Sequence, residues 1–198
     1  MSPRADAVRN RQKILDAARE QITRSGPEAG MDEIAAAAGV AVGTLYRHFP
    51  NKTDLVTAVI AEYLGHVADD AEAANARLAA GATAIDEITS FVERVLETSA
   101  VDHAVKAAAR ALGAATVDEA AESRARAAVE PLIAAAQKDG DLHPDVTVDD
   151  FYLLISSAPI DQPPEARARW LTLVFRGLVG PESLKRSENI GKRRPPSR

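Results

Sequence analysis

The sequence lacks several features that define common classes of protein. It has no cysteine among its 198 residues, so it can form neither a disulfide nor a thiolate metal site. Its apolar stretches are short and interrupted by charges, and its first residues, MSPRADAVRNRQK, do not contain the apolar segment of a secretory signal. We therefore expect a cytoplasmic protein that has no membrane partner.

The residues that carry chemistry follow none of the patterns typical of enzymes. There is no Gly-rich phosphate-binding loop and no arrangement similar to a Ser-His-Asp triad. The histidines His66, His103 and His143 are not spaced as metal ligands, and no cysteine supports them. The sequence predicts no metal site, no cofactor and no catalytic residue. An all-helical enzyme remains the less favoured alternative.

The net charge of −5 hides an uneven distribution. Residues 56–180 carry ten Lys and Arg against twenty Asp and Glu, whereas residues 181–198 carry six against two. Residues 1–55 are close to neutral, although phosphate binding requires local positive charge. Four basic side chains can share one face in this part of the chain: Arg9, Arg11, Arg47 and Lys52.

Apolar residues recur at helical spacing along most of the chain, and Gly and Pro fall between these segments. Together with abundant alanine, this pattern predicts an all-α protein. We expect helices at residues 8–25, 31–39, 42–49, 52 to beyond 64, 83–100, 101–114, 117–139, 147–158 and 164–179. Thr147 and Asp150 have the spacing of a capping box.

Two of the short helices form the motif that carries the functional prediction. They are MDEIAAAAG and VGTLYRHF, joined at Gly39, where glycine allows the chain to turn at positive φ. A helix-turn-helix of this kind offers its second helix to the major groove of DNA. Ala35 has to be small because the helices cross there. Four apolar residues are expected to point inward: Ile34, Val40, Leu45 and Phe49.

The residues left outside this motif are suited to contact DNA. These candidates are Ala41, Val42, Gly43, Thr44, Tyr46, Arg47, His48 and Lys52. Their hydroxyl, phenol, guanidinium, imidazole and ammonium groups can donate hydrogen bonds to phosphates and to base edges. An ordinary pair of core helices with a glycine turn is the alternative explanation of the same pattern.

Residues 9 to about 60 resemble the N-terminal domain of TetR-type transcriptional repressors. The resemblance rests on ILDAA, MDEIAAAAGVAVGTLYRHFPNK and DLVTAVI. It implies a homodimer that binds double-stranded DNA, with a larger helical domain that dimerises and binds a small effector. The segments DVTVDDFYLLISSAP and EARARWLTLVFRGL are similar to the C-terminal part of an actinobacterial subgroup.

The resemblance also assigns expected roles to individual residues. Three of them would face the groove at the start of the second helix: Val42, Gly43 and Thr44. Three others would hold phosphates: Tyr46, His48 and Lys52. Arg47 would reach a phosphate or a base edge. Many relatives have Ser or Thr where Gly30 stands, so a hydroxyl that caps the first helix and touches phosphate is missing from this chain, and Asp32 adds negative charge nearby.

Apolar stripes in the second half leave two explanations open. One stripe contains Trp170, Leu171, Val174, Phe175 and Leu178, and the other contains Phe151, Leu154, Ile155 and Ala158. Both stripes can be intramolecular core, or the two helices can form a four-helix bundle with a second copy, which the resemblance favours. A cavity would be lined by the same residue types, so the effector-binding residues stay unknown.

We therefore predict three parts. Residues 1–50 form a helix-turn-helix DNA-binding domain, residues 51–180 form a helical ligand-binding and dimerisation domain, and residues 181–198 form a basic, disordered tail. The expected function is regulation of transcription, most simply by a repressor that a small molecule releases from a palindromic operator. A constitutive DNA-binding protein without an effector is the second alternative.

Overall fold

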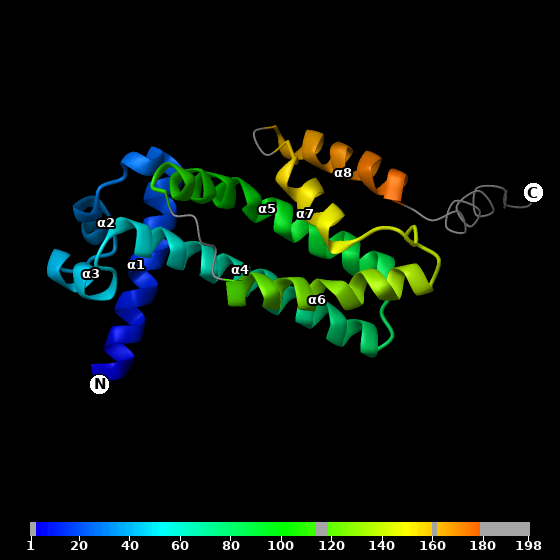
Figure 1. Cartoon of the computed structure of the whole chain (residues 1–198), viewed down its shortest axis with the longest axis horizontal. Helices are drawn as coiled ribbons and strands as arrows, with labels where there is room; N and C mark the ends of the chain where they lie inside the picture. The colour runs from blue at the N-terminus through cyan, green and yellow to red at the C-terminus, as the bar shows by residue number, and fades with distance from the viewer. Residues whose placement is uncertain (1–2, 114–118, 160–161, 179–198) are drawn as a thin grey trace, which may run out of the picture. The chain divides into compact units, whose positions relative to one another are not determined.

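The computed structural model describes residues 3–113, 119–159 and 162–178, and the regular elements in these ranges are all helical (Figure 1). The elements are α1 (Pro3–Ser25), the 3-10 turn η1 (Gly26–Glu28), α2 (Met31–Ala37), α3 (Val42–His48), α4 (Lys52–Ala79), α5 (Ala84–Ala111), α6 (Glu119–Lys138), α7 (Val148–Ser156) and α8 (Pro164–Leu178). The prediction of an all-α fold is confirmed. The predicted tail at 181–198 lies outside the described residues.

Two predictions of helix boundaries differ from the structure by more than two residues. The prediction of separate helices at 83–100 and 101–114 is wrong, because α5 continues from Ala84 to Ala111 and this segment contains no Gly or Pro to end it. The first helix begins at Pro3 instead of residue 8. Proline is tolerated in the first turn of a helix, where its missing N–H has no helical partner to lose.

Contacts in space between residues divide the chain into two compact units. The first contains residues 1–66 and 98–124, and the second contains residues 67–97 and 125–198. Helices α4, α5 and α6 therefore each contribute residues to both units. Each unit has its own hydrophobic core.

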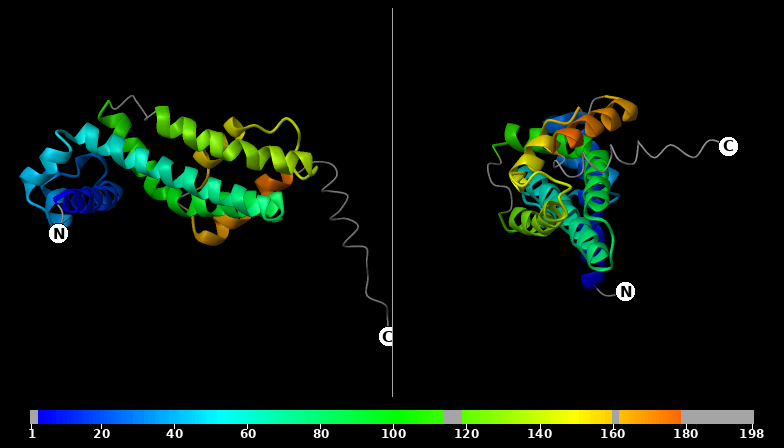
Figure 2. Two further views of the ribbon diagram at one scale, coloured as in Figure 1. Left: turned by 90° about the horizontal axis from the view of Figure 1, so that it is seen from below. Right: turned by 90° about the vertical axis from the view of Figure 1, so that its right-hand side faces the viewer.

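The core of the first unit holds the short helices α2 and α3 against α1. Both helices contact α1 and each other, and the left view of Figure 2 shows the three blue helices lying together. The largest fully buried side chains of this core are Ile14, Leu15, Ile22, Ile34, Leu45, Leu55, Val56, Val59 and Val105. Since they come from α1 through α5, burial of these side chains fixes the orientation of α3 within the unit.

The second unit is built from the remaining parts of α4, α5 and α6 together with α7 and α8. Asn75 on α4 donates a hydrogen bond to the carbonyl of Ala128 on α6, with 2.8 Å between the two atoms. Helix α7 begins with the predicted capping box, in which the Thr147 hydroxyl accepts from the Asp150 N–H and the Asp150 carboxylate accepts from the Thr147 N–H.

Candidate nucleic-acid interface

The turn between α2 and α3 depends on Gly39. Its φ of 63° lies in the left-handed region, and the space around it is open, so glycine is required by backbone conformation and not by crowding. The Val40 N–H donates to the carbonyl of Ala35 at 3.1 Å, which closes the end of α2. Ala35 itself is fully buried, as the crossing of the two helices requires.

Helix α3 is anchored by its inward side. Leu45 is fully buried and Phe49, the residue that follows the helix, is almost so. Ala41 caps the start of α3 through its backbone, because its carbonyl accepts from the Thr44 N–H at 2.8 Å. Val40 is partly buried against the same core. The predicted inward set of residues is confirmed.

The opposite side of α3 is open to solvent. Ala41, Gly43 and Arg47 are exposed, while 40% of Val42 and 44% of Tyr46 are accessible. Thr44 and His48 are half-buried at the edges of this face. The seven predicted contacts from Ala41 to His48 therefore lie on one short element that is held from behind, which is the arrangement that a groove-reading helix needs.

Lys52 starts α4 and is placed differently from the α3 residues. Its half-buried side chain donates a hydrogen bond from Nζ to the carbonyl of Pro27 in η1. An ammonium group has three donors, so two remain for a phosphate. The contact also fixes where the charge sits, between the turn after α1 and the start of α4.

The first turn of α2 is closed by its own acid. The Gly30 N–H donates to the carboxylate of Glu33, with 3.0 Å between nitrogen and oxygen. In this chain the carboxylate satisfies a free N–H at a helix start, a position that attracts anions. No hydroxyl is present at residue 30 to offer a phosphate a further donor.

The basic residues of α1 are engaged in different ways. Arg9 pairs with Asp6 on the same helix. The Arg11 guanidinium lies over the ring of Phe49, 5.4 Å from its centroid. Arg11 therefore lies beside the end of α3, whereas the charge of Arg9 is compensated within α1.

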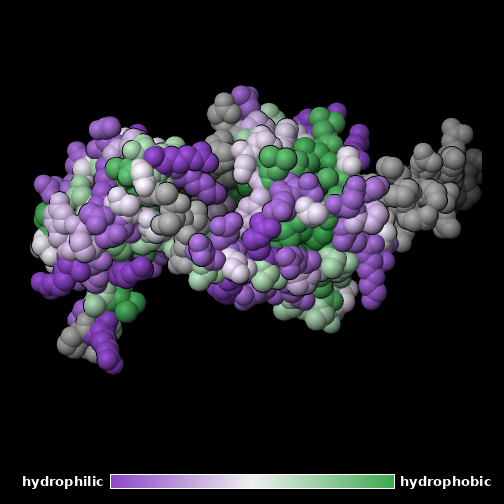
Figure 3. Space-filling model, in the orientation of Figure 1, coloured by the Kyte–Doolittle hydropathy of each residue, from purple (hydrophilic) through white to green (hydrophobic). Residues whose placement is uncertain are grey.

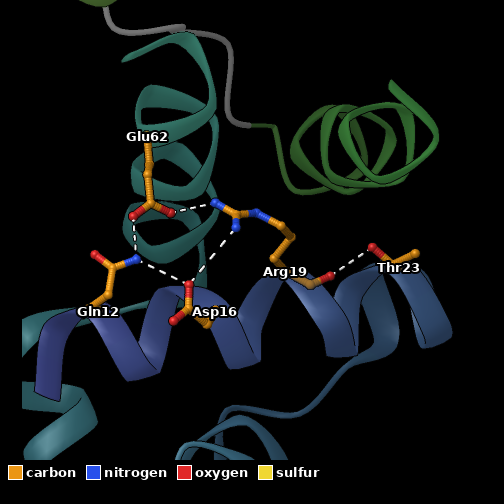
Figure 4. Close-up of polar contacts among 5 residues, drawn as sticks. All are labelled: Gln12, Asp16, Arg19, Thr23 and Glu62. Carbon is orange, nitrogen blue, oxygen red and sulfur yellow. Dashed lines mark hydrogen bonds and ion pairs between the residues drawn. The ribbon is translucent and has the colours of Figure 1, made fainter. Parts of the chain in front are cut away.

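Helix α1 is tied to α4 by a polar network that the sequence did not indicate (Figure 4). The Glu62 carboxylate, only 14% exposed, accepts from Gln12 at 2.7 Å and from Arg19 at 2.5 Å. Gln12 and Arg19 both also face Asp16, at 3.1 and 3.9 Å. The network joins two turns of α1 to one carboxylate, and residues this far apart in sequence give no local signal.

Metal-binding clusters and membrane-spanning helices are absent from the described residues. In the ranges that the structure describes, no three His, Cys, Asp or Glu side chains are grouped as metal ligands, and none of the helices is long and apolar enough to cross a bilayer. The His143 ring contacts Asp145 and His66 is exposed. The side chain of His103 lies outside the described residues.

Two segments of the chain match the models of known protein families. Residues 14–59 match "Bacterial regulatory proteins, tetR family", and residues 84–179 match "Transcriptional regulator SbtR-like, C-terminal domain". An HTH-type transcriptional regulator of Pseudomonas putida is 45% identical over 58 residues, which are 29% of this chain and 43% of that protein. The matched segment thus spans less than half of this relative's length.

Solved structures extend the similarity to nearly the whole chain. A TetR transcription regulatory protein from Mycobacterium vanbaalenii is 31% identical, with a TM-score of 0.71 over 90% of this chain and 99% of that one. A TetR transcriptional regulator from Streptomyces coelicolor is 26% identical, with a TM-score of 0.66 over 86% and 99%. The chain belongs to the TetR family of transcription regulators, which bind DNA.

Proposed function

We propose that this regulator is a homodimeric repressor that binds a palindromic operator through α3 and leaves it when a small molecule binds the second unit. The observation that supports DNA binding is that one face of α3 is open to solvent while its other face is buried in the core of the first unit. Val42, Gly43 and Thr44 contact base edges, and apolar contact with a thymine methyl group contributes most to the recognition of sequence. The phosphate contacts come from Tyr46, Arg47, His48 and Lys52, with Ala41 at the helix start.

An apolar surface on the last two helices supports the homodimer. Leu153 on α7 is 68% exposed and Leu173 on α8 is 51% exposed, although both are large apolar residues. Apolar side chains gather over this part of the second unit in the space-filling view (Figure 3). Pairing α7 and α8 with the same helices of a second copy covers this surface and forms a four-helix bundle with twofold symmetry.

A palindromic operator follows from that symmetry. Two copies of α3 related by a twofold axis meet two equivalent half-sites, separated by about 34–36 Å when they occupy successive turns of the duplex. A ligand that prefers a different separation of the two helices lowers affinity for DNA by its differential affinity for the two states.

The second unit contains an apolar cavity that limits what the effector can be. It is lined by Val92 of α5 and by residues of α7 and α8, including Phe151, Trp170 and Phe175, and has a volume of about 10 Å³. This volume is at the lower limit for a single water molecule, while small-molecule sites measure about 300–1,000 Å³. Binding an effector there requires these helices to separate, and the lining selects an apolar molecule.

The small cavity also favours the second candidate function, a constitutive DNA-binding regulator without an effector. In such a regulator no small molecule distinguishes the DNA-bound state from the free state, so DNA affinity would be independent of small molecules. The proposal divides the chain by function into three parts. Residues 1–50 together with Lys52 contact DNA, residues 51–180 bind the effector and form the dimer, and residues 181–198 are a basic tail.

The experiment that tests the DNA part is selection of bound sequences from a random duplex pool by the purified protein at defined salt. Recovery of one palindromic site supports the proposal, and recovery of no preferred sequence by folded protein contradicts it. The Tyr46→Ala and Arg47→Ala variants should then lose operator affinity while keeping assembly state and melting temperature.

A matched control separates DNA contact from loss of charge alone. Lys138 is exposed in the last turn of α6 and belongs to the second unit, so Lys138→Ala should leave operator affinity unchanged. The dimer is tested by Leu173→Glu, which should convert the assembly to monomer in sedimentation velocity. Release of the operator by added small apolar molecules distinguishes a ligand-responsive repressor from the constitutive regulator.

A further inference from the structure

The first turns of α1 continue the buried face of this helix into solvent. Positions 22, 18 and 15 are buried on one face, and the same face continues at positions 11, 8 and 4 because residues three and four apart align on a helix. Those three positions are occupied by Arg11, Val8 and Arg4, all exposed. The extension is longer than the sequence pattern predicted, because α1 begins at Pro3.

The composition of this exposed face is unusual for a helix end in solvent. Val8 is 70% exposed, and it lies between two arginines that have no acid on their own face. The acid of this segment, Asp6, is turned toward Arg9 and compensates its charge. What remains is a strip of two guanidinium groups and one branched apolar side chain.

Arg11 connects this strip to the DNA-contacting helix. Its guanidinium lies over the ring of Phe49, an almost fully buried residue that follows directly after α3. The strip therefore starts beside the end of α3 and runs outward along α1. Arg4 and Arg11 are seven positions apart, so their Cα atoms are about 10 Å apart along the helix axis. This distance equals about three steps between successive phosphates along one DNA strand.

We propose that the strip formed by Arg4, Val8 and Arg11 contacts the sugar-phosphate backbone of the operator next to the groove occupied by α3. This inference rests on the proposed DNA contact of α3 and adds a second contact to it. The guanidinium groups of Arg4 and Arg11 pair with phosphates, and Val8 packs on the sugar edges between them. The exposed valine is then covered in the complex.

The test is the salt dependence of operator affinity, measured by fluorescence anisotropy with the duplex recovered by selection and carrying ten further base pairs on each side. Each phosphate contact contributes about 0.9 to the slope of log affinity against log salt. Arg4→Ala in a homodimer should therefore reduce the slope by about 1.8. Its effect on affinity should be about tenfold larger at 50 mM than at 200 mM salt.

Lys13 is the matched control on the same helix. It is exposed, and it lies nine residues, or about two and a half turns, from Arg4, so it faces the opposite side of α1. Lys13→Ala removes the same charge and should leave the slope at the wild-type value. Val8→Ser should weaken binding about two- to threefold at every salt concentration, because the loss of one apolar contact does not change the number of phosphates neutralised.

Trimming the added base pairs supplies an independent readout. The wild-type protein should lose affinity on the trimmed duplex, and Arg4→Ala should lose less because its contact is already absent. Equal slopes for wild type, Arg4→Ala and Lys13→Ala would overturn the inference while leaving the α3 contact intact. Failure of the wild-type protein to prefer any sequence would instead contradict the proposed function itself.

Discussion

The guanidinium of Arg19 on α1 donates to the carboxylate of Glu62 on α4, across 43 residues of sequence and with 2.5 Å between the two atoms. Glu62 receives a second hydrogen bond from Gln12, two turns earlier on α1. Because α2 and α3 pack on α1, this carboxylate stabilises the frame that holds α3, the proposed DNA-contacting helix.

Replacing Glu62 by Ala should destabilise the first unit by about 1 kcal/mol, because two hydrogen bonds to a poorly exposed carboxylate are lost. Urea denaturation followed by circular dichroism measures this loss, and a double-mutant cycle with Arg19→Met isolates the pair. Asp6→Ala is the control, since the Asp6–Arg9 pair is exposed and should contribute little. A zero coupling energy between Arg19 and Glu62 would contradict the prediction.

The two glycines of the helix-turn-helix should respond oppositely to alanine. Gly39→Ala should cost about 1–2 kcal/mol, because alanine disfavours its positive φ although nothing crowds the position. Gly43→Ala lies within α3, also in open space, and should stabilise the helix by about 0.5–1 kcal/mol. Thermal melts of both variants check the signs, and two shifts in the same direction would refute this account of the turn.

Neighbouring residues on α3 should separate stability from DNA contact. Leu45→Ala should cost about 2–5 kcal/mol and lower operator affinity with it, because Leu45 is fully buried. Tyr46→Ala, one position later on the open face, should lower affinity at unchanged stability. Paired urea titrations and binding isotherms make the comparison. A strongly destabilised Tyr46→Ala protein would show that this side chain supports the fold instead.

The start of α7 should make stability depend on pH. The Asp150 carboxylate accepts from the Thr147 hydroxyl and, in addition, from its backbone N–H, and these hydrogen bonds hold the pKa of Asp150 below its usual value. A lowered pKa means that the stabilisation is complete above the ordinary carboxyl range and is lost as the pH falls through the lowered value.

The difference in melting temperature between the wild type and Asp150→Asn should therefore be largest near neutral pH and disappear in acid. Calorimetry across that range measures this difference. The Thr147→Val protein is the reference, because it lacks the hydroxyl hydrogen bond that lowers the pKa of Asp150 most. A difference that persists unchanged in acid would show that the charge of Asp150 is not responsible.

The sequence predicted the parts of this site that depend on local rules. Gly39 specified the turn, the spacing of Leu45 and Phe49 specified the buried side of α3, and Thr147 with Asp150 specified a cap. Each of these signals depends on residues a few positions apart, where backbone conformation and helical period decide the outcome.

The features that were missed depend on contacts between distant residues. In the sequence, nothing distinguishes Glu62 from an ordinary surface acid, because its partners are on α1. The contact of Lys52 with Pro27 likewise joins residues that are 25 positions apart. The continuity of α5 was missed for another reason: residues 84–111 contain no Gly or Pro, so no helix breaker supported the predicted boundary at residue 100.

Gly30 leaves room for a change that the fold already accommodates. Its backbone is extended, and an added Cβ would meet the Glu33 side chain only at ordinary contact distances of 3.5 Å or more. A serine there would therefore fit without strain and would supply a hydroxyl where α2 begins. We expect Gly30→Ser to raise the affinity of the protein for DNA, because the added hydroxyl would offer a phosphate one further donor. This single position at the start of α2 would then adjust the strength of DNA binding without any change to α3.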